Sequence, residues 1–227
     1  SYPQMVTLAH GDAKIVNTSE ENYFKMTPEQ LEEAITKKTK VIILCNPSNP
    51  TGSVYNRQEL KALAEVIEDK NIYVIADEIY EKLIYDDLQF TSFASINDKM
   101  KERTLVINGF SKSYAMTGWR IGYAAGPSHV IQAMHKVQSH STSGPNSISQ
   151  KAAVEALTGP QEQLEAMRKE FQKRRDFLLK SLNEIEGISC VKPEGAFYLF
   201  PNLSHYLGKS TDVFKVDNSF DLAMHLL

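Results

Sequence analysis

The sequence is poor in cysteine, in long apolar runs and in excess charge of either sign. It has only two cysteines in 227 residues, and Cys45 and Cys190 both lie in apolar segments without C-x-x-C or histidine spacing. Reduced core thiols in a reducing, cytoplasmic setting are therefore expected, and neither a disulfide nor a metal site is predicted. No apolar run is long enough to cross a membrane, so no membrane partner is expected. The formal net charge of −3 comes without a basic stripe, which argues against a nucleic-acid partner.

The two ends of the chain look like interior sequence. Residues Ser1–Met5 contain neither a start methionine nor a signal-peptide pattern, and the chain stops at Leu227 within a helical pattern. We therefore expect a fragment of a longer protein. Its length leaves room for one large domain over residues 1–160 and for a linking helix and part of a smaller α+β domain over residues 161–227.

Apolar strands and capped helices alternate through the first part of the sequence. Val41–Cys45 and Ile72–Ala76 are apolar without polar alternation, as expected of parallel strands covered on both faces. Thr27–Gln30 and Asn56–Glu59 have the paired residues of capping boxes, which predicts a helix at each. A strand, a crossover helix and a second strand form a βαβ unit. The expected fold class is therefore α/β, with a mostly parallel sheet flanked by helices on both faces.

Apolar periodicity and turn residues predict the remaining elements. Strands are predicted at residues 5–9, 14–16, 104–108 and 121–125, with a strand pair at 188–191 and 196–200. Helices are predicted over residues 128–138, 147–157 and 162–185, and an unfinished helix starts at about residue 218. Ser128 is the expected cap of the first of these helices, and Gly187 is expected to stop the third.

Polar residues follow three of the predicted strands at their carboxyl ends. They are Asn49 after the first strand, Asp77 and Tyr80 after the second, and Lys112 and Arg120 after the third. Ligands of an open parallel sheet bind at this edge, so we expect these side chains to form one site. Each residue alone has an ordinary explanation, such as a helix cap, core packing or a surface cation resting on an aromatic ring. The whole set is hard to explain by packing.

Three motifs in these segments resemble those of a known family. They are Asn49-Pro-Thr-Gly52, Asp77-Glu-Ile-Tyr80, and Ser111-Lys112 followed by Met116-Thr-Gly-Trp-Arg-Ile-Gly122. Their order and separations resemble the fold-type I pyridoxal-phosphate-dependent aminotransferases of class I/II, most closely the bacterial aspartate aminotransferase branch. The resemblance runs through essentially the whole chain. It implies the large cofactor-binding domain of that fold.

The resemblance implies a role for each residue toward pyridoxal 5′-phosphate. Lys112 corresponds to the lysine that holds the cofactor as a Schiff base and then acts as a general base. Asp77 corresponds to the catalytic carboxylate that faces the pyridine nitrogen, where an anion favours the protonated ring. Tyr80 and Asn49 correspond to the pair that hydrogen-bonds the phenolic oxygen of the ring, and Asn49 also to a residue that reaches the substrate carboxylate.

The phosphate of the cofactor is assigned by the same resemblance to Arg120, whose planar fork of donors suits it, with Ser111 adding a hydroxyl. Gly109 stands where many members have serine or threonine, so phosphate binding depends more on Arg120 and Ser111. The resemblance also implies a cis Asn49–Pro50 bond. In the family, the phosphate-cradling loop, the ring-stacking aromatic residue, the partner-subunit tyrosine and the arginine for the substrate α-carboxylate lie outside this sequence.

The implied activity is transfer of an amino group between an amino acid and a 2-oxo acid, with aspartate and 2-oxoglutarate as the leading pair, in a cytoplasmic homodimer. Three alternatives stay open at this point. One is an aminotransferase for aromatic, alanine-type or prephenate substrates, or a related lyase. The second is a non-catalytic regulator that uses this fold to sense the cofactor. The third is a structural α/β domain in which Lys112 does not react with pyridoxal phosphate.

Overall fold

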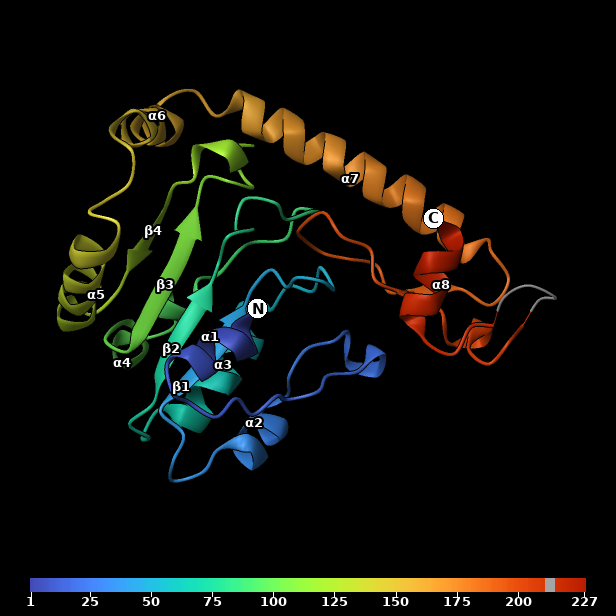
Figure 1. Ribbon diagram of the computed structural model, residues 1–227, viewed down its shortest axis with the longest axis horizontal. Helices are drawn as coiled ribbons and strands as arrows, with labels where there is room; N and C mark the ends of the chain where they lie inside the picture. Colours follow the sequence, from blue (N-terminus) through green and yellow to red (C-terminus); the bar gives the residue numbers. More distant parts are fainter. Residues whose placement is uncertain (211–214) are drawn as a thin grey trace.

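The computed structural model describes residues 1–210 and 215–227 (Figure 1). In this part of the chain the α-helices are α1 (Tyr2–Leu8), α2 (Pro28–Ala34), α3 (Arg57–Ile67), α4 (Asp98–Lys101), α5 (Ser128–Ser141), α6 (Ser147–Thr158), α7 (Glu162–Asn183) and α8 (Ser219–Leu226). The strands are β1 (Val41–Cys45), β2 (Tyr73–Asp77), β3 (Thr104–Gly109), β4 (Gly122–Ala125), β5 (Ser189–Cys190) and β6 (Pro201–Asn202).

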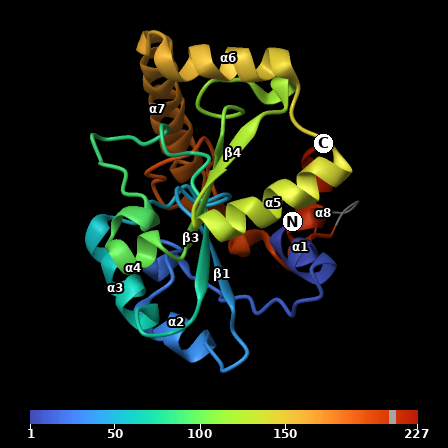
Figure 2. The ribbon, with the colours of Figure 1, turned by 90° about the vertical axis from the view of Figure 1, so that its left-hand side faces the viewer.

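The main sheet has the strand order β1-β2-β3-β4. The first three strands are parallel, and β4 runs antiparallel to β3 as the second arm of a hairpin. Figure 2 shows α2, α3 and α4 on one side of the sheet and α5 on the other. The predicted α/β class with a mostly parallel sheet is therefore confirmed. In the register, Cys45 pairs with Asp77 and Asp77 with Ile107, so the carboxyl ends of the first three strands lie side by side.

The capping boxes start α2 and α3 where the sequence predicts them. The Thr27 side chain accepts a hydrogen bond from the Gln30 backbone, and the Gln30 side chain accepts one from the Thr27 backbone. Asn56 and Glu59 make the same reciprocal pair at the start of α3. Each box satisfies backbone donors that the first turn of a helix leaves without partners. These helices are therefore fixed by local sequence before any packing is considered.

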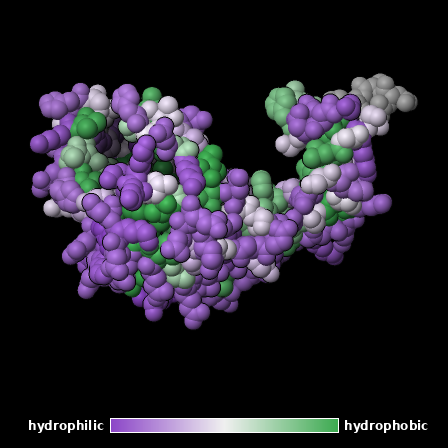
Figure 3. Space-filling model, turned by 90° about the horizontal axis from the view of Figure 1, so that it is seen from below, coloured by the Kyte–Doolittle hydropathy of each residue, from purple (hydrophilic) through white to green (hydrophobic). Residues whose placement is uncertain are grey.

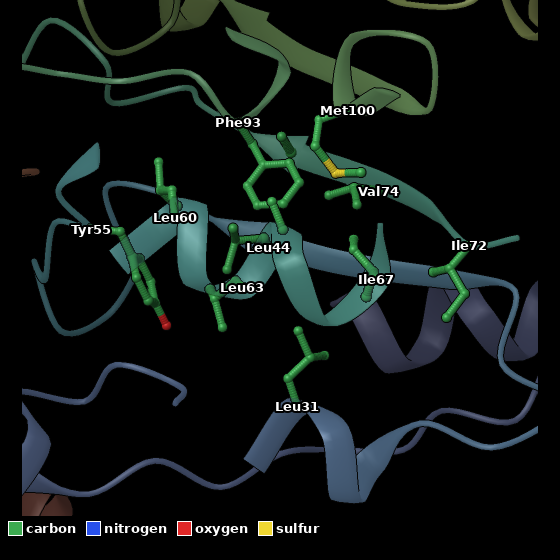
Figure 4. Packing of buried hydrophobic residues seen from close by; sticks show 12 residues of the cluster. Leu31, Leu44, Tyr55, Leu60, Leu63, Ile67, Ile72, Val74, Phe93 and Met100 are labelled. Atoms are coloured by element: carbon green, nitrogen blue, oxygen red, sulfur yellow. The ribbon is translucent and has the colours of Figure 1, made fainter. Parts of the chain in front are cut away.

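The main hydrophobic core lies between α3 and the adjoining face of the sheet (Figure 4). Leu60, Leu63 and Ile67 of α3 are buried against Leu44 of β1 and Val74 of β2. The remaining buried members are Leu31, Tyr55, Ala64, Ile72, Ala76, Phe93 and Met100. Burial of a side chain of this size contributes about 1.5–3 kcal/mol, so this cluster holds the strands whose ends carry the polar motifs.

The C-terminal elements gather at the far end of α7. Figure 1 shows α7 running from α6 to the region of α8, and Figure 3 shows a smaller lobe set apart from the larger body. The segment between β5 and β6 returns to the main sheet, because the backbone N–H groups of Glu194 and Gly195 donate to the Gly52 carbonyl at 2.9 and 2.8 Å. Ala196 also donates to the Leu83 carbonyl at 2.9 Å. Residues 194–196 are therefore joined to the loops at the sheet edge.

Four of the sequence predictions on local structure are wrong. Residues 5–9 mostly belong to α1, because Pro3 sits in the first turn of a helix and Ser1 precedes it as N-cap, and residues 14–16 are not a strand. The second arm of the C-terminal hairpin is β6, two residues at 201–202, because the aromatic residues just before it pack into the site edge instead. The N-cap of α5 is Pro127, so Ser128 is the first helical residue.

Candidate active site

The loops after β1, β2 and β3 carry the predicted site residues. Asn49 lies in the loop after β1, Asp77 is the last residue of β2, and Tyr80 follows it in a turn. Lys112 lies in the loop between β3 and β4. Because these strands are parallel and neighbouring, their loops open at one edge of the sheet. The strand order therefore places the loops that carry these side chains at one edge of the sheet, as the sequence predicts.

The loop after β1 has two cis peptide bonds, Asn46–Pro47 and Asn49–Pro50. The second confirms the bond that the family resemblance implies. The buried Asn46 side chain accepts a hydrogen bond from the Tyr55 backbone at 2.9 Å, which ties the start of the loop to the start of α3. Gly52 closes the loop with φ +71°, a left-handed conformation suited to glycine. Asn49 is thus presented by a tightly constrained turn.

Asp77 is held by donors on two sides. Its Oδ1 accepts from the Ile79 backbone N–H at 3.3 Å, and its Oδ2 accepts from the Tyr2 hydroxyl at 2.5 Å. Burial raises the pKa of Tyr2, and the nearby Cys45 thiol and Asp77 carboxylate act in the same direction. The Tyr2 hydroxyl therefore keeps its proton and remains a donor to the carboxylate. Tyr2 is not among the residues that the sequence predicts for the site.

Tyr80 is 2% exposed and lies in a group of hydroxyl and amide side chains. Its hydroxyl is 2.5 Å from the hydroxyl of Tyr198, and Asn49 Nδ2 donates to the same Tyr198 oxygen at 3.5 Å. Burial is the main cause that raises the pKa of Tyr80. Two predicted site residues, Asn49 and Tyr80, are therefore connected through a third that the motifs do not contain.

Lys112 extends toward aromatic rings from the loop after β3. Its Nζ lies 5.9 Å from the centroid of the Tyr80 ring and 5.5 Å from that of Phe197. Attraction between a cation and the face of a ring acts over such distances. Phe197 also contacts Tyr80 and Tyr198 edge-on or tilted, with centroids 5.4 and 4.8 Å apart. The amine therefore lies beside the Tyr80 phenol in a half-buried, aromatic setting.

Ser111 and Arg120 flank the base of the Lys112 loop. Gly109 pairs with Gly122 across the hairpin, and the Phe110 N–H donates to the Ile121 carbonyl at 3.4 Å. The exposed Arg120 donates from Nη1 to the Thr117 carbonyl of its own loop at 3.0 Å. Within the described part of the chain, the contacts at the site bring together Asn49, Tyr80 and Lys112, with Asp77 beside them in the β2 turn, but they do not join Arg120 or Ser111 to that group.

Gly109 has a steric reason for being glycine. A Cβ atom there would lie 3.1 Å from the Gly122 Cα, 3.1 Å from Ile79 Cδ1 and 3.2 Å from the Ile121 carbonyl oxygen. Such contacts are tight, and the neighbouring atoms would have to shift by a few tenths of an ångström to admit a side chain. The close approach of the hairpin and the Asp77 turn therefore favours glycine at this position.

Glu78 lies directly behind the site and is 3% exposed. Its Oε1 accepts from the Ser92 hydroxyl at 2.8 Å and from the Phe93 N–H at 3.0 Å. Burial raises the pKa of Glu78 to about 7, against a smaller lowering by these two hydrogen bonds. Glu78 therefore fixes the segment that delivers Phe93 to the core while its neighbour Asp77 faces the site.

Sequence reasoning missed Tyr2, Phe197 and Tyr198. Tyr2 lies three residues before the strand predicted at 5–9, in a segment that folds as α1 with Pro3 in its first turn. The aromatic propensity of Phe197 and Tyr198 predicts a strand of the second domain at residues 196–200. No local pattern indicates that a segment more than 100 residues away reaches the strand ends, because the hydrogen bond from Tyr198 to Tyr80 spans 118 positions.

Comparisons with known proteins show the family and the fold of the chain. The sequence profile of the family described as aminotransferase class I and II matches residues 1–225. The chain belongs to this family. The aspartate aminotransferase of Bacillus subtilis (strain 168) is 54% identical to it over 202 residues, 89% of this chain and 51% of that protein. The aspartate/prephenate aminotransferase of Cereibacter sphaeroides is 52% identical over 212 residues, 93% of this chain and 53% of that protein.

Solved structures of aminotransferases have the same fold. The aspartate aminotransferase from Rhizobium meliloti matches with a TM-score of 0.95 and 42% identity, over 100% of this chain and 57% of that chain. The aromatic aminotransferase from Pyrococcus horikoshii OT3 matches with a TM-score of 0.84 and 42% identity, over 88% of this chain and 54% of that chain. The predicted family is therefore confirmed. The chain spans about half the length of the curated relatives that it matches.

Two further features of the described residues bear on binding. Over residues 1–210 and 215–227, no helix combines the length and hydrophobicity needed to cross a membrane. The same residues contain no group of three or more histidine, cysteine, aspartate or glutamate side chains placed to hold a metal ion. Cys45 and Cys190 are free thiols, Cys190 buried and Cys45 half-buried, as the sequence predicts.

Proposed function

We propose that the complete gene product is an aminotransferase that moves an amino group between aspartate and 2-oxoglutarate with pyridoxal 5′-phosphate as cofactor. The observation that carries the proposal is the arrangement at the sheet edge, where the Lys112 amine lies 5.9 Å from the ring of Tyr80 and Tyr80 follows Asp77 in the β2 turn. The name of the B. subtilis relative supports the substrate pair in its amino-acid half.

The side chains present fit the chemical groups of pyridoxal phosphate. An amine at Lys112 suits its aldehyde, a carboxylate at Asp77 suits a protonated ring nitrogen, and the Tyr80 phenol suits the ring oxygen. The guanidinium of Arg120 suits the phosphate. In addition, the buried Ser113 Oγ next to the lysine has no hydrogen-bond partner among the described residues. Such an unpaired polar atom is uncommon unless another group satisfies it.

Each residue then has a defined task. When bound, pyridoxal phosphate supplies an electrophilic aldehyde and a ring that withdraws electrons. Lys112 would hold the aldehyde carbon of the cofactor through Nζ, and its free amine would accept a proton from the substrate α-carbon. Asp77 keeps a proton at the ring nitrogen by its opposite charge, with its own orientation fixed by Tyr2 and the Ile79 N–H.

The remaining residues orient the cofactor and the substrate and transfer no proton themselves. Arg120 and Ser111 bind the phosphate from the base of the Lys112 loop, and Asn49 donates to the substrate carboxylate and to the ring oxygen together with Tyr80. Phe197 covers the lysine with its ring at 5.5 Å and so limits access of water to the amine.

A second substrate class is prephenate, which the name of the C. sphaeroides relative includes at 52% identity. The aromatic aminotransferase from P. horikoshii shares the fold at 42% identity, so the fold alone does not choose the amino acid. Half-reactions with aspartate, glutamate, alanine and phenylalanine, and with prephenate as acceptor, separate these alternatives.

We further propose a cytoplasmic homodimer with a large domain over residues 1–160 and a smaller domain that begins with α7. Val137 of α5 and Ile148 of α6 are 71% and 69% exposed, and apolar side chains so exposed support coverage by further protein surface in the complete gene product. The expected mass in solution, measured by light scattering, is twice that of the subunit. A monomeric mass contradicts the dimer.

The test of the activity is spectroscopic. The complete gene product with pyridoxal phosphate is expected to develop a visible absorbance band and to convert aspartate and 2-oxoglutarate. Lys112→Ala is expected to lose both, whereas Lys151→Ala, on the exposed surface of α6, keeps both. If the Lys112 variant still transaminates, the assignment is wrong. A band without any amino-group transfer favours the sensing regulator, and no band at all favours a structural domain.

A further inference from the structure

Tyr198 lies outside the sequence motifs and connects two of their residues. Its oxygen is 2.5 Å from the Tyr80 hydroxyl and accepts from Asn49 Nδ2 at 3.5 Å. Its ring meets the Tyr80 ring edge-on, with the centroids 5.7 Å apart. Both partners are predicted to touch the cofactor, so a group that orients them acts on the reaction without touching the reacting atoms.

The donors and acceptors give these hydrogen bonds a direction. The amide nitrogen of Asn49 carries only donors, so the Tyr198 oxygen must accept from it. Either hydroxyl of the Tyr80–Tyr198 pair can donate, and Tyr198 keeps its own hydrogen for donation to the Tyr80 oxygen 2.5 Å away. Hydrogen bonds arranged head to tail polarise and strengthen one another. In this order the hydroxyl hydrogen of Tyr80 is not used by Tyr198 and remains available to a third group.

The position of Tyr198 is fixed by backbone contacts of the residues before it as well as by the packing of its ring. Ala196, two residues earlier, donates to the Leu83 carbonyl at 2.9 Å, and its carbonyl accepts from the Tyr85 hydroxyl. Gly195 is joined to the loop that carries Asn49, through the Gly52 carbonyl at 2.8 Å. The hydroxyl of Tyr198 is therefore presented to Tyr80 by a segment anchored on both sides of the site.

We propose that Tyr198 is a positioning residue whose hydroxyl donates to Tyr80 and thereby reserves the hydroxyl hydrogen of Tyr80 for the cofactor bound at Lys112. This inference rests on the proposed function, because the third group is the ring oxygen of pyridoxal phosphate. The segment after β5 would then influence the hydrogen bonding of the cofactor, although the other site residues come from the loops at the strand ends.

The test is a double-mutant cycle with Tyr198→Phe, Tyr80→Phe and both together in the complete gene product. Each change removes one oxygen and keeps the ring. The first measurement is the pH midpoint of the visible band with pyridoxal phosphate, and the second is urea unfolding without cofactor. Tyr206→Phe is the matched control, because it removes a hydroxyl that donates to the Glu186 carbonyl at 2.5 Å in another part of the chain.

Tyr80→Phe is expected to move the band midpoint, and Tyr198→Phe to move it in the same direction by about half to one pH unit, since one hydrogen bond is lost. In the Tyr80→Phe background, Tyr198→Phe is expected to add nothing, because the hydrogen it orients is already gone. The Tyr206→Phe control leaves the midpoint unchanged.

Other outcomes overturn the inference. If the two shifts add independently, or if Tyr198→Phe leaves the midpoint in place, Tyr198 does not orient Tyr80. Coupling of the two tyrosines in urea unfolding without a band shift means a purely structural pair. If the wild-type protein has no visible band, the proposed function fails first, and the role of Tyr198 toward the cofactor fails with it. A wild-type band that Tyr198→Phe does not affect overturns only the role of Tyr198.

Discussion

The buried carboxylate of Glu78 is expected to make the stability of the protein fall as the pH rises. Its pKa is raised from 4.5 to about 7 in the folded protein, chiefly by burial. Between these two values the unfolded chain has an ionised Glu78 while the folded chain keeps it protonated. The unfolded state then binds fewer protons, so the free energy of unfolding decreases with increasing pH.

The size of the effect follows from the shift in pKa. Each pKa unit corresponds to about 1.4 kcal/mol, so the shift from 4.5 to about 7 amounts to roughly 3 kcal/mol. This contribution is fully present below pH 4.5 and is lost as the pH passes through about 7. Glu78→Gln removes the titration while its Oε1 can still accept from Ser92 and Phe93.

Urea unfolding of wild type and Glu78→Gln at a series of pH values from 4.5 to about 8 measures this contribution. The variant is expected to gain up to roughly 3 kcal/mol over wild type between the ends of the series. Glu32→Gln is the control, because its side chain is exposed and its replacement leaves the slope unchanged. If wild type and Glu78→Gln give parallel curves, burial does not keep Glu78 protonated and the reasoning is refuted.

Three further changes test the packing around the site, each by urea unfolding. Asp86→Asn weakens the ion pair with the buried Arg175 and is expected to lower the free energy of unfolding by about 1–2 kcal/mol near neutral pH. Wild type itself loses this stabilisation as the pH falls from 3.8 through about 2. An unchanged free energy of unfolding in the variant would contradict a stabilising pair. Gly52→Ala is expected to be destabilised by about 1 kcal/mol or more, since φ is +71° and a Cβ would lie 2.5 Å from Pro193 Cβ. Leu63 is 2% exposed in the main core, so Leu63→Ala is expected to lower the free energy of unfolding by about 2–5 kcal/mol. A loss below about 1 kcal/mol would indicate that the surrounding side chains move to fill the cavity.

The strands of the sheet could be predicted from sequence because their signals are local. Val41–Cys45 is a continuous apolar run with β-branched residues, which indicates a strand. The expected coverage on both faces is wrong for this strand, because β1 lies at the edge of the sheet, with Val41 exposed and only Leu44 fully buried. The capping boxes before α2 and α3 are equally local, since the residues that exchange hydrogen bonds are three positions apart. Once the strands are placed, the rule that ligands bind at their carboxyl ends brings Asn49, Asp77 and Lys112 together.

The rest of the site depends on contacts that no short pattern encodes. Tyr2 reaches Asp77 across 75 positions, and it lies in α1, part of which the sequence pattern predicts as a strand. Phe197 and Tyr198 have strand propensity, but packing against Tyr80 overrides it. Packing of this kind is a property of the assembled loops, so sequence periodicity could not reveal it.

The large sequence separation between Tyr198 and its partners also determines the order in which parts of the site form during synthesis of the chain. Asn49 and Tyr198 are 149 positions apart, and at ribosomal rates of about 5–20 residues per second this separation corresponds to roughly 7–30 seconds. During that interval β1, β2 and β3 can emerge and pair, while Lys112 has neither Phe197 over its amine nor Tyr198 beside Tyr80. The nascent protein therefore passes through a stage in which the sheet can be formed and its reactive edge is still open.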